Sequence, residues 1–203
     1  MLSEYRVIEF SDYPAGSILG MHLADQGAEV IKVEPITTSQ EIELMEKNFI
    51  SRYEKQDLEY SVWNRGKKSF ALNWIDRSNL LKLISISDIF IENIDFHTRE
   101  NARPSRKKEK NKVDLKISYE IAKKVNPEII YIKFTSFPEN HPYEHLPSKE
   151  ELISSASGIY AMNGSGQTPV KGEGPSFHEI PYSSGMAGIT AAPAVAAAIS
   201  QKS

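Results

Sequence analysis

The sequence predicts an α/β fold: a Rossmann-like, doubly wound sheet that is mostly parallel and has helices on both faces. Short β-rich runs alternate with segments of helical periodicity along most of the chain. The β-rich runs contain few polar interruptions, which is typical of strands buried on both faces. Strands that alternate with helices favour a parallel sheet, because each helix carries the chain back to the same edge. In such a sheet, ligands bind at the carboxyl ends of the strands.

The length and composition favour a single domain over residues 1–203, since 40% hydrophobic residues are enough for a sizeable core. The first three elements are expected as a compact βαβ unit, with Gly27 as the C-cap of its helix. The expected elements, in chain order, are strand Arg6–Phe10, helix Ala15–Gln26, strand Glu29–Pro35, strand Ser69–Trp74, helix Asp76–Ile86, strand Asp88–Asn93, helix Leu115–Val125, strand Glu128–Phe137, a short helix after Glu150, and an Ala-rich C-terminal helix that Pro193 interrupts.

The charge is nearly balanced, with 24 basic and 27 acidic residues and a formal net charge of −3. No global field therefore attracts nucleic acid or an anionic membrane, and we expect neither as a partner. The sequence contains no cysteine, which excludes a thiolate nucleophile, a disulfide framework and a Cys-based metal site. The stretch MLSEYRVIEF has no basic region and no long apolar run, so we expect neither a signal peptide nor a membrane span, and a cytoplasmic location.

Two further segments favour ordinary structural roles. Residues 99–112 carry seven basic and two acidic residues without apolar periodicity, which is typical of a solvated loop, with phosphate binding as the alternative. His141 and His145 lie in a proline-flanked segment, where a surface position is favoured over a metal site because no supporting carboxylate can be assigned. The G-x-G-x-x-G, Walker A, G-x-S-x-G and H-E-x-x-H patterns are all missing. We therefore expect no metal and no glycine-rich phosphate loop.

Several stretches, in this order and spacing, match the pattern of one family. They are AGSILGMHLADQGAEVIKVEP (Ala15–Pro35), NRGKKSFALN (Asn64–Asn73), SDIFIEN (Ser87–Asn93), NPEIIYIKFTSF (Asn126–Phe137) and SGIYAMNG (Ser157–Gly164). The chain resembles family III of the CoA-transferases, the CaiB/BaiF group that includes formyl-CoA transferase and carnitine CoA-transferase. The resemblance covers nearly the whole chain, which is expected to correspond to the N-terminal half of the family, with the C-terminal part absent.

The resemblance implies a protein that binds CoA or acyl-CoA as a substrate, without a covalently bound cofactor, and takes part in the transfer of CoA between carboxylic acids. Its implied partners are a CoA thioester, a carboxylic acid, and a second chain in a homodimer or a heteromeric assembly. The resemblance places CoA contacts at Arg65, Lys67 and Lys68, in a turn where cations can reach a phosphate without burial. It places Asn93 near the nucleotide. Taken alone, the cations are as typical of a solvated loop, and Asn93 of a turn.

The family's members are thought to use an aspartate as a covalent nucleophile, in a GDxxSG-like segment before an Ala-rich helix. Here that segment reads IPYSSGM, and Pro181 occupies the aspartate position. Glu179 is one candidate replacement, although its attachment point is displaced by roughly 6 to 7 Å in an extended segment. Glu150 matches another carboxylate of the family's active-site region, and a solvent-facing helix position is equally consistent with the sequence. Related racemases need a histidine where this chain has Lys149, which disfavours racemisation.

Whether the chain is itself an enzyme stays open at the level of sequence. The first hypothesis is a family III CoA-transferase protein or subunit, with the chemistry supplied wholly or partly by a partner that carries the aspartate. The alternative is a catalytically inactive CoA-binding or interaction subunit that supports an active partner. A third hypothesis is a self-contained transferase with a glutamate nucleophile.

Overall fold

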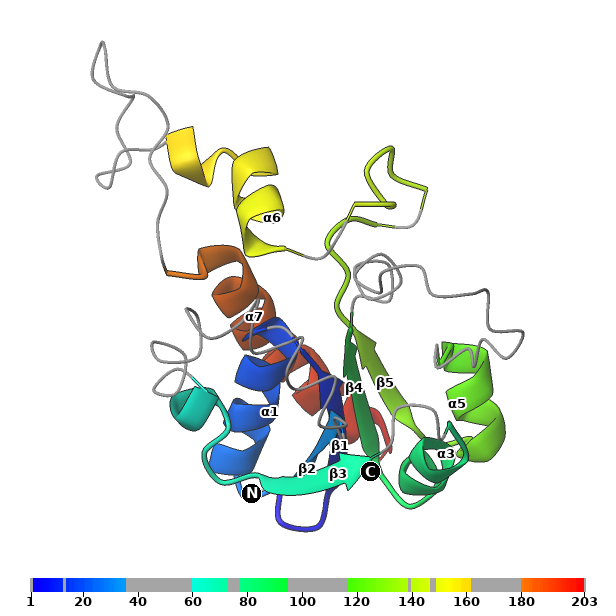
Figure 1. Cartoon of the computed structure of the whole chain (residues 1–203). Coiled ribbons are helices and arrows are strands. Elements are labelled where there is room, and N and C mark those ends of the chain that lie inside the picture. Colours follow the sequence, from blue (N-terminus) through cyan, green and yellow to red (C-terminus); the bar gives the residue numbers. More distant parts are fainter. Residues whose placement is uncertain are drawn as a thin grey trace, which may run out of the picture.

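The computed structural model describes residues 2–12, 14–35, 60–72, 77–94, 117–138, 140–146, 149–161 and 180–202. Its elements are β1 (Arg6–Ser11), α1 (Pro14–Asp25), β2 (Glu29–Pro35), β3 (Lys68–Leu72), α3 (Arg77–Ser85), β4 (Ile89–Asn93), α5 (Tyr119–Val125), β5 (Ile130–Lys133), α6 (Glu150–Ala156), the 3₁₀ turn η1 (Ile159–Ala161) and α7 (Tyr182–Lys202). The five strands form one parallel sheet in the order β3-β2-β1-β4-β5 (Figure 1). This is the doubly wound topology that the sequence predicted.

The central strands β1 and β4 are buried along almost their whole length. Arg6 at the start of β1 is partly exposed, whereas all five residues of β4 are buried. Val7 is level with Ile89, and Ile8 with Phe90. Successive residues of both strands therefore point alternately to the two faces of the sheet, and both faces are apolar. This explains why the strands are nearly continuous apolar runs in the sequence.

Helices cover both faces of the sheet, as the sequence predicted. Figure 1 shows α1 and α7 on one side and α3 and α5 on the other. The core beneath α1 and α7 includes Val7, Leu19, Leu23, Val30, Ile89, Ile91, Val195 and Ile199. The core beneath α3 and α5 includes Ile8, Phe10, Val33, Leu80, Ile84, Phe90 and Ala122.

Helix α1 lies close against the sheet because two glycines on one of its sides leave room for polar groups of the strands. A Cβ at Gly16 would come within 2.8 Å of Ser11 Cβ and 2.9 Å of Asn93 Cβ. A Cβ at Gly20 would come within 2.0 Å of Glu9 Oε2. Residues four apart share one face of a helix, so both glycines face the sheet.

The sequence predicted that Pro193 interrupts the C-terminal helix. In the structure, α7 runs without a break through Pro193. Proline removes one backbone donor, the one that would bond the carbonyl of Ile189 four residues earlier. Pro193 and Ile189 are both exposed, so water can bond this carbonyl and the helix continues.

By length and apolar composition, α7 also qualifies as a candidate membrane span, with 22% of its apolar window buried. Its residues Val195 and Ile199 nevertheless pack in the core beside α1. Helices of a protein core meet the same criteria of length and composition, so α7 is weak evidence for a membrane.

Strand β5 ends at Lys133, before the strand end that the sequence predicted at Phe137. The Phe134 N–H still donates to Glu92 O at 2.9 Å, and the chain then leaves the sheet. Trp74, Asp76 and the charged segment 99–112 lie outside the described residues. The predicted strand end at Trp74, the predicted helix start at Asp76 and the predicted loop at 99–112 therefore stay predictions.

Candidate functional site

A pocket of about 100 Å³ opens at the carboxyl edge of the sheet. Its lining consists of Ala15 at the start of α1, Asn93 at the end of β4, residues 134–136 after β5, Glu150 and Ile153 of α6, and Ser183, Ser184 and Ala187 of α7. Next to it lie β1 and β4, the neighbouring strands from which the sheet winds in opposite directions. The pocket therefore lies where open α/β sheets bind their ligands.

Asn93 connects this edge of the sheet to the first turn of α1. Its side chain is buried, and Asn93 Oδ1 accepts a hydrogen bond from the Gly16 N–H at 3.0 Å. The first N–H groups of a helix have no partner within the helix, so Asn93 satisfies one of them. The missing side chain at Gly16 is what allows this close approach.

Glu150 holds the start of α7. Its Oε1 accepts hydrogen bonds from the Ser183 N–H at 2.9 Å and the Ser154 hydroxyl at 2.7 Å. Its Oε2 accepts from the Ser184 N–H at 2.9 Å and the Ser184 hydroxyl at 2.6 Å. The alternative of a solvent-facing helix glutamate is therefore wrong, because the carboxylate is directed at α7 and engages four donors.

Glu150 is held in its ionised form. Burial raises the pKa of this carboxyl, but the Ser184 and Ser154 hydroxyls and the backbone N–H groups of Ser183 and Ser184 outweigh burial and hold the pKa below its ordinary value. The N-terminal end of a 21-residue helix also favours a negative charge. An ionised carboxylate with all its oxygens engaged is suited to positioning, and must release hydrogen bonds before it can attack a substrate.

Pro181 directly precedes α7. Its carbonyl accepts a hydrogen bond from the Gly185 N–H at 2.8 Å, so this residue begins the hydrogen-bonding pattern of the helix. The side chain at such a position commonly caps the next N–H groups, and proline has no group to do so. Glu150 supplies that cap from another helix. Glu179, the other candidate nucleophile, lies outside the described residues.

Two cations at the junction between the turn and β3 form exposed ion pairs. Arg65 pairs with Asp25 at the end of α1, and Lys68 Nζ lies 2.6 Å from Glu29 Oε1 on β2. The side chains of Arg65 and Lys68 are 48% and 69% exposed, so both can exchange their partner for a ligand phosphate.

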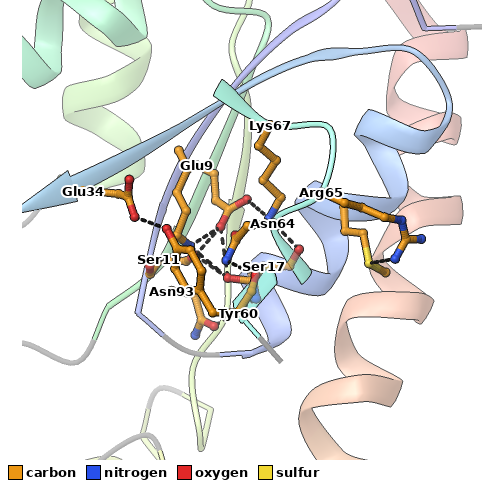
Figure 2. Close-up of polar contacts among 12 residues, drawn as sticks. Glu9, Ser11, Ser17, Glu34, Tyr60, Asn64, Arg65, Lys67 and Asn93 are labelled. Carbon is orange, nitrogen blue, oxygen red and sulfur yellow. Dashed lines mark hydrogen bonds and ion pairs between the residues drawn. The ribbon is translucent and has the colours of Figure 1, made fainter. Parts of the chain in front are cut away.

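Lys67, between these two cations, is different. Its side chain is only 2% exposed, and Lys67 Nζ lies 2.7 Å from Glu9 Oε2. The same ammonium donates to Ser17 O at 2.8 Å and to Asn64 Oδ1 at 3.0 Å (Figure 2). The expectation that all three cations avoid burial is therefore wrong for Lys67, because its side chain turns inward toward a carboxylate of the central strand.

Lys67 belongs to a buried polar cluster, which we call the Glu9 cluster and define as Glu9, Ser11, Ser17, Lys32 and Lys67. Lys32 Nζ donates to Glu9 Oε1 at 2.7 Å and to the Ser17 hydroxyl at 3.0 Å. The Ser11 hydroxyl donates to Glu9 Oε1 at 2.6 Å. The cluster thus places two ammonium groups around one carboxylate between the sheet and α1 (Figure 2).

The two lysines decide the charge of Glu9. Burial raises its pKa, but the charges of Lys32 and Lys67 together outweigh burial and hold the pKa below the ordinary value. The pKa of Lys67 is lowered to about 8, chiefly by burial and also by the charge of Lys32, against the opposing effect of Glu9. The cluster therefore carries an excess positive charge at neutral pH.

The pocket and the cationic turn are separate places on the sheet. Asn93 is level with Ser11, whereas Lys68 is level with Ile31 and so with Ile8. Three residues along a strand correspond to about 10 Å, and the three strand spacings between β3 and β4 to about 14 Å. A ligand that contacts both places must be long.

Glu9 and Lys32 were not among the residues that the sequence singled out. The signal that could have found them is a charged residue flanked by apolar residues in each of two β-rich runs, RVIEF and EVIKVEP. Strands buried on both faces cannot keep such charges unpaired, so the charges of adjacent strands must meet. The register pairs Glu9 with Lys32 directly.

In the part of the chain that the structure describes, no group of three or more His, Cys, Asp or Glu residues could hold a metal ion. His141 stacks on Phe137, with ring centroids 5.2 Å apart, and His141 Nδ1 accepts from the Tyr143 N–H. Both contacts are structural.

The fold and the site together define a doubly wound α/β protein with a pocket at the point where the sheet winds in opposite directions and a separate cationic turn beside α1. The sequence model of the family described as CoA-transferase family III matches residues 2–203. The chain belongs to this family, which confirms the resemblance.

Named relatives agree with this assignment. The succinate–glutarate CoA-transferase of Agrobacterium fabrum is 27% identical over 169 residues, which cover 80% of this chain and 39% of the relative. The succinyl-CoA:glutarate CoA-transferase of Mus musculus is 28% identical over 166 residues, which cover 80% of this chain and 34% of the relative. The chain therefore spans well under half the length of these two relatives.

Solved structures share the fold. A CAIB/BAIF family protein from Brucella suis matches with a TM-score of 0.74 and 21% identity, over 99% of this chain and 49% of that chain. The hypothetical protein Rv3272 from Mycobacterium tuberculosis matches with a TM-score of 0.70 and 24% identity, over 99% of this chain and 51% of that chain. These likenesses confirm the predicted α/β fold.

Proposed function

We propose that residues 1–203 form one CoA-binding domain of a CoA-transferase that moves CoA between carboxylic acids. The observation that carries this proposal is the pocket at the carboxyl edge of the sheet, in a chain that belongs to CoA-transferase family III. The names of two relatives describe succinate or succinyl-CoA and glutarate as their substrates. CoA or acyl-CoA is then a substrate here, and no covalently bound cofactor is required.

CoA carries its phosphates at one end and its sulfur at the other, so one extended molecule can contact two separate places. We assign the phosphates to the turn that holds Arg65, Lys67 and Lys68. Exposed ion pairs contribute only about 0 to 1 kcal/mol, so replacing Asp25 or Glu29 by a phosphate is inexpensive. Pockets for whole ligands measure roughly 300 to 1,000 Å³, so the smaller pocket suits the thioester end.

In the pocket, we assign Asn93 and Glu150 to the thioester end of CoA. For transfer, a carboxylate attacks the thioester carbonyl, the C–S bond breaks, CoA leaves as a thiolate, and the acyl group remains as an anhydride on the attacking carboxylate. The thiolate then attacks the anhydride at the enzyme's carbonyl, which forms an enzyme thioester and releases the original acid. Glu150 and Glu179 are the two carboxylates proposed for this role.

Pro181 favours a second candidate function, a CoA-binding subunit without catalytic activity that supports an active partner. Proline offers no carboxylate at the position of the family's nucleophile. Glu150 must give up hydrogen bonds to two serine N–H groups before it can attack. A partner chain that carries an aspartate removes this difficulty.

We also propose assembly into a homodimer or with a partner subunit, in the cytoplasm, where water-soluble CoA thioesters are available. Helix α7 and the residue before Pro181 expose large apolar side chains, with Ile180 61%, Met186 60% and Ile189 50% exposed. These side chains are the surface that we assign to contact with a second chain.

The test of CoA binding is calorimetric titration of CoA and succinyl-CoA into the wild-type chain and into Arg65→Ala/Lys68→Ala. A matched control is Lys82→Ala on α3, an exposed lysine on the other face of the sheet whose ammonium donates to Asn79 Oδ1. We expect saturable binding that the double variant loses and the control keeps. No binding to the folded wild type contradicts the proposal.

The two candidate functions differ in covalent chemistry. After incubation with succinyl-CoA, hydroxylamine converts a glutamyl thioester into a hydroxamate that mass spectrometry locates. A hydroxamate at Glu150 or Glu179 supports transfer by this chain. Saturable CoA binding without any hydroxamate supports the non-catalytic subunit.

A further inference from the structure

The turn before β3 is held to the body of the domain by one buried side chain. Lys67 Nζ reaches Glu9 Oε2 on β1 and Ser17 O on α1, at 2.7 and 2.8 Å. Arg65 and Lys68 stay at the surface on either side of it. Lys67 thus joins the turn to both layers of the fold.

Lys67 also organises the turn itself. Its ammonium donates to Asn64 Oδ1 at 3.0 Å, and Asn64 Nδ2 donates to Tyr60 O at 2.9 Å (Figure 2). The Lys67 N–H donates to Asn64 O, and Gly66 between them has a φ of +73°, which suits glycine. The backbone that carries Arg65 is therefore shaped by contacts of Lys67.

Helix α1 leaves space for the side chain of Lys67 at Gly20. A Cβ at Gly20 would lie 2.0 Å from Glu9 Oε2 and 3.2 Å from Lys67 Nζ. Only glycine leaves room there for the carboxylate and the ammonium. Lys67 and Glu9 therefore fill a space that α1 provides beside the sheet.

Burial decides which role Lys67 plays toward an anion. The side chains of Arg65 and Lys68 are 48% and 69% exposed, so both can turn toward a phosphate. The side chain of Lys67 is 2% exposed, and its ammonium would have to leave Glu9 Oε2, Ser17 O and Asn64 Oδ1 to reach a phosphate. Direct contact between Lys67 and a phosphate is therefore disfavoured.

We propose that Lys67 is a positioning residue, whose buried ion pair with Glu9 holds the Asn64–Lys68 turn in the conformation that presents Arg65 and Lys68 to the phosphates of CoA. This inference rests on the proposed function for its ligand, and it gives Lys67 a role different from that of its two neighbours. It makes the Glu9 cluster part of the binding apparatus without any contact to the ligand.

The first experiment needs no ligand. Lys67→Met removes the ammonium and leaves a neutral pair of Glu9 and Lys32, so the variant is expected to fold. Hydrogen exchange at the Asn64 and Lys67 amides is expected to accelerate at least about fivefold, while amides of β1 and β4 keep their protection. Unchanged exchange in the turn overturns the inference.

The second experiment measures the CoA dissociation constant. Lys67→Met is expected to weaken CoA binding about fivefold or more, which corresponds to about 1 kcal/mol. Glu9→Gln is expected to weaken it similarly, and the double variant no further, because the Lys67–Glu9 ion pair is lost in either single variant. If Lys67 contacted the phosphate directly, Glu9→Gln would release it and leave binding equal or tighter, which overturns the inference.

Chemical rescue separates positioning from a general loss of stability. The chain has no cysteine, so Lys67→Cys can be aminoethylated in denaturant at this site alone and refolded, which restores an ammonium on a side chain of nearly the same length. We expect rescue of both turn protection and CoA affinity, with Lys82→Met as the unaffected control. No binding by wild type refutes the proposed function, whereas wild-type binding with unaltered affinity in Lys67→Met refutes the positioning role.

Discussion

In the Glu9 cluster, charged side chains are buried between the sheet and α1. Lys32 and Lys67 share one buried carboxylate. The Ser11 and Ser17 hydroxyls accept hydrogen bonds from Lys32, and the Ser17 carbonyl accepts one from Lys67. A buried charge without a full counter-charge is costly. The cost is expressed in the lowered pKa of Lys67, which titrates near pH 8 in the folded chain.

The pKa of Lys67 predicts a pH dependence of stability. Its folded-state value of about 8 lies below the ordinary value of 10.5, so between these values the unfolded chain binds more protons and stability rises with pH. From pH 7 to above pH 10.5, wild type should gain up to about 3 kcal/mol relative to Lys67→Met. Urea unfolding of both proteins from pH 7 to 10 should already show much of this difference, and a constant difference contradicts the prediction.

At the element scale, α1 and α7 are positioned by glycines that allow close packing and by a helix cap that comes from another helix. Gly16 and Gly20 let α1 approach polar groups of the sheet, and a Cβ at Gly188 of α7 would lie 2.8 Å from Ala15 O on α1. The start of α7, after Pro181, is capped from α6 by Glu150. The pocket lies between these elements, so their placement shapes it.

Gly20→Ala should destabilise the fold, although alanine in a helix is normally favoured over glycine by about 1 kcal/mol. The added Cβ would collide with the carboxylate of Glu9, and we expect a loss of about 1 to 3 kcal/mol in the free energy of unfolding. The matched control is Gly185→Ala in α7, where a Cβ meets nothing within 4 Å and stability should rise. Equal effects of the two substitutions in thermal unfolding would argue against the close approach.

Glu150→Gln should loosen α7, because an amide cannot accept from all the donors that the carboxylate engages. We expect a loss of about 1 to 2 kcal/mol at pH 7, as for the removal of a helix cap. The pKa of Glu150 is held low, so its contribution is present above pH 4.5 and is lost as the pH falls through that lowered value. Glu151→Gln, the neighbour on α6, is the control. A difference between the two variants that persists into strong acid would refute the assignment.

At the scale of the whole molecule, α7 has two faces with different roles. One face packs in the core through Val195 and Ile199, whereas the other exposes Met186 and Ile189. The same helix lines the pocket through Ser183, Ser184 and Ala187, so a partner bound to the exposed face would lie close to the pocket.

Met186→Lys/Ile189→Lys should abolish self-association or partner binding and leave the fold intact, since substitutions of exposed residues usually change stability by less than about 0.5 kcal/mol. Light scattering after size-exclusion chromatography measures the mass, and circular dichroism the melting temperature. Ile86→Lys, at a residue that is 57% exposed after α3, is the control. An unchanged mass in all variants assigns the α7 face no part in assembly.

The order of the elements, the parallel sheet and the cover of helices on both faces could be predicted from local patterns in the sequence. These features depend on local periodicity and on short runs such as RVIEF and DIFIEN, in which several apolar residues repeat the same signal. The family resemblance followed from motif order, which the match over residues 2–203 confirms.

The environments of the charged residues follow from the folded structure and not from local patterns. Lys67 and Lys68 are neighbours in the sequence, yet the side chain of Lys67 is 2% exposed and that of Lys68 is 69% exposed. Glu150 meets Ser184 across 34 positions of the chain. Such pairings depend on which distant side chains the fold brings together and on whether water reaches them, and neither quantity is present in a local pattern.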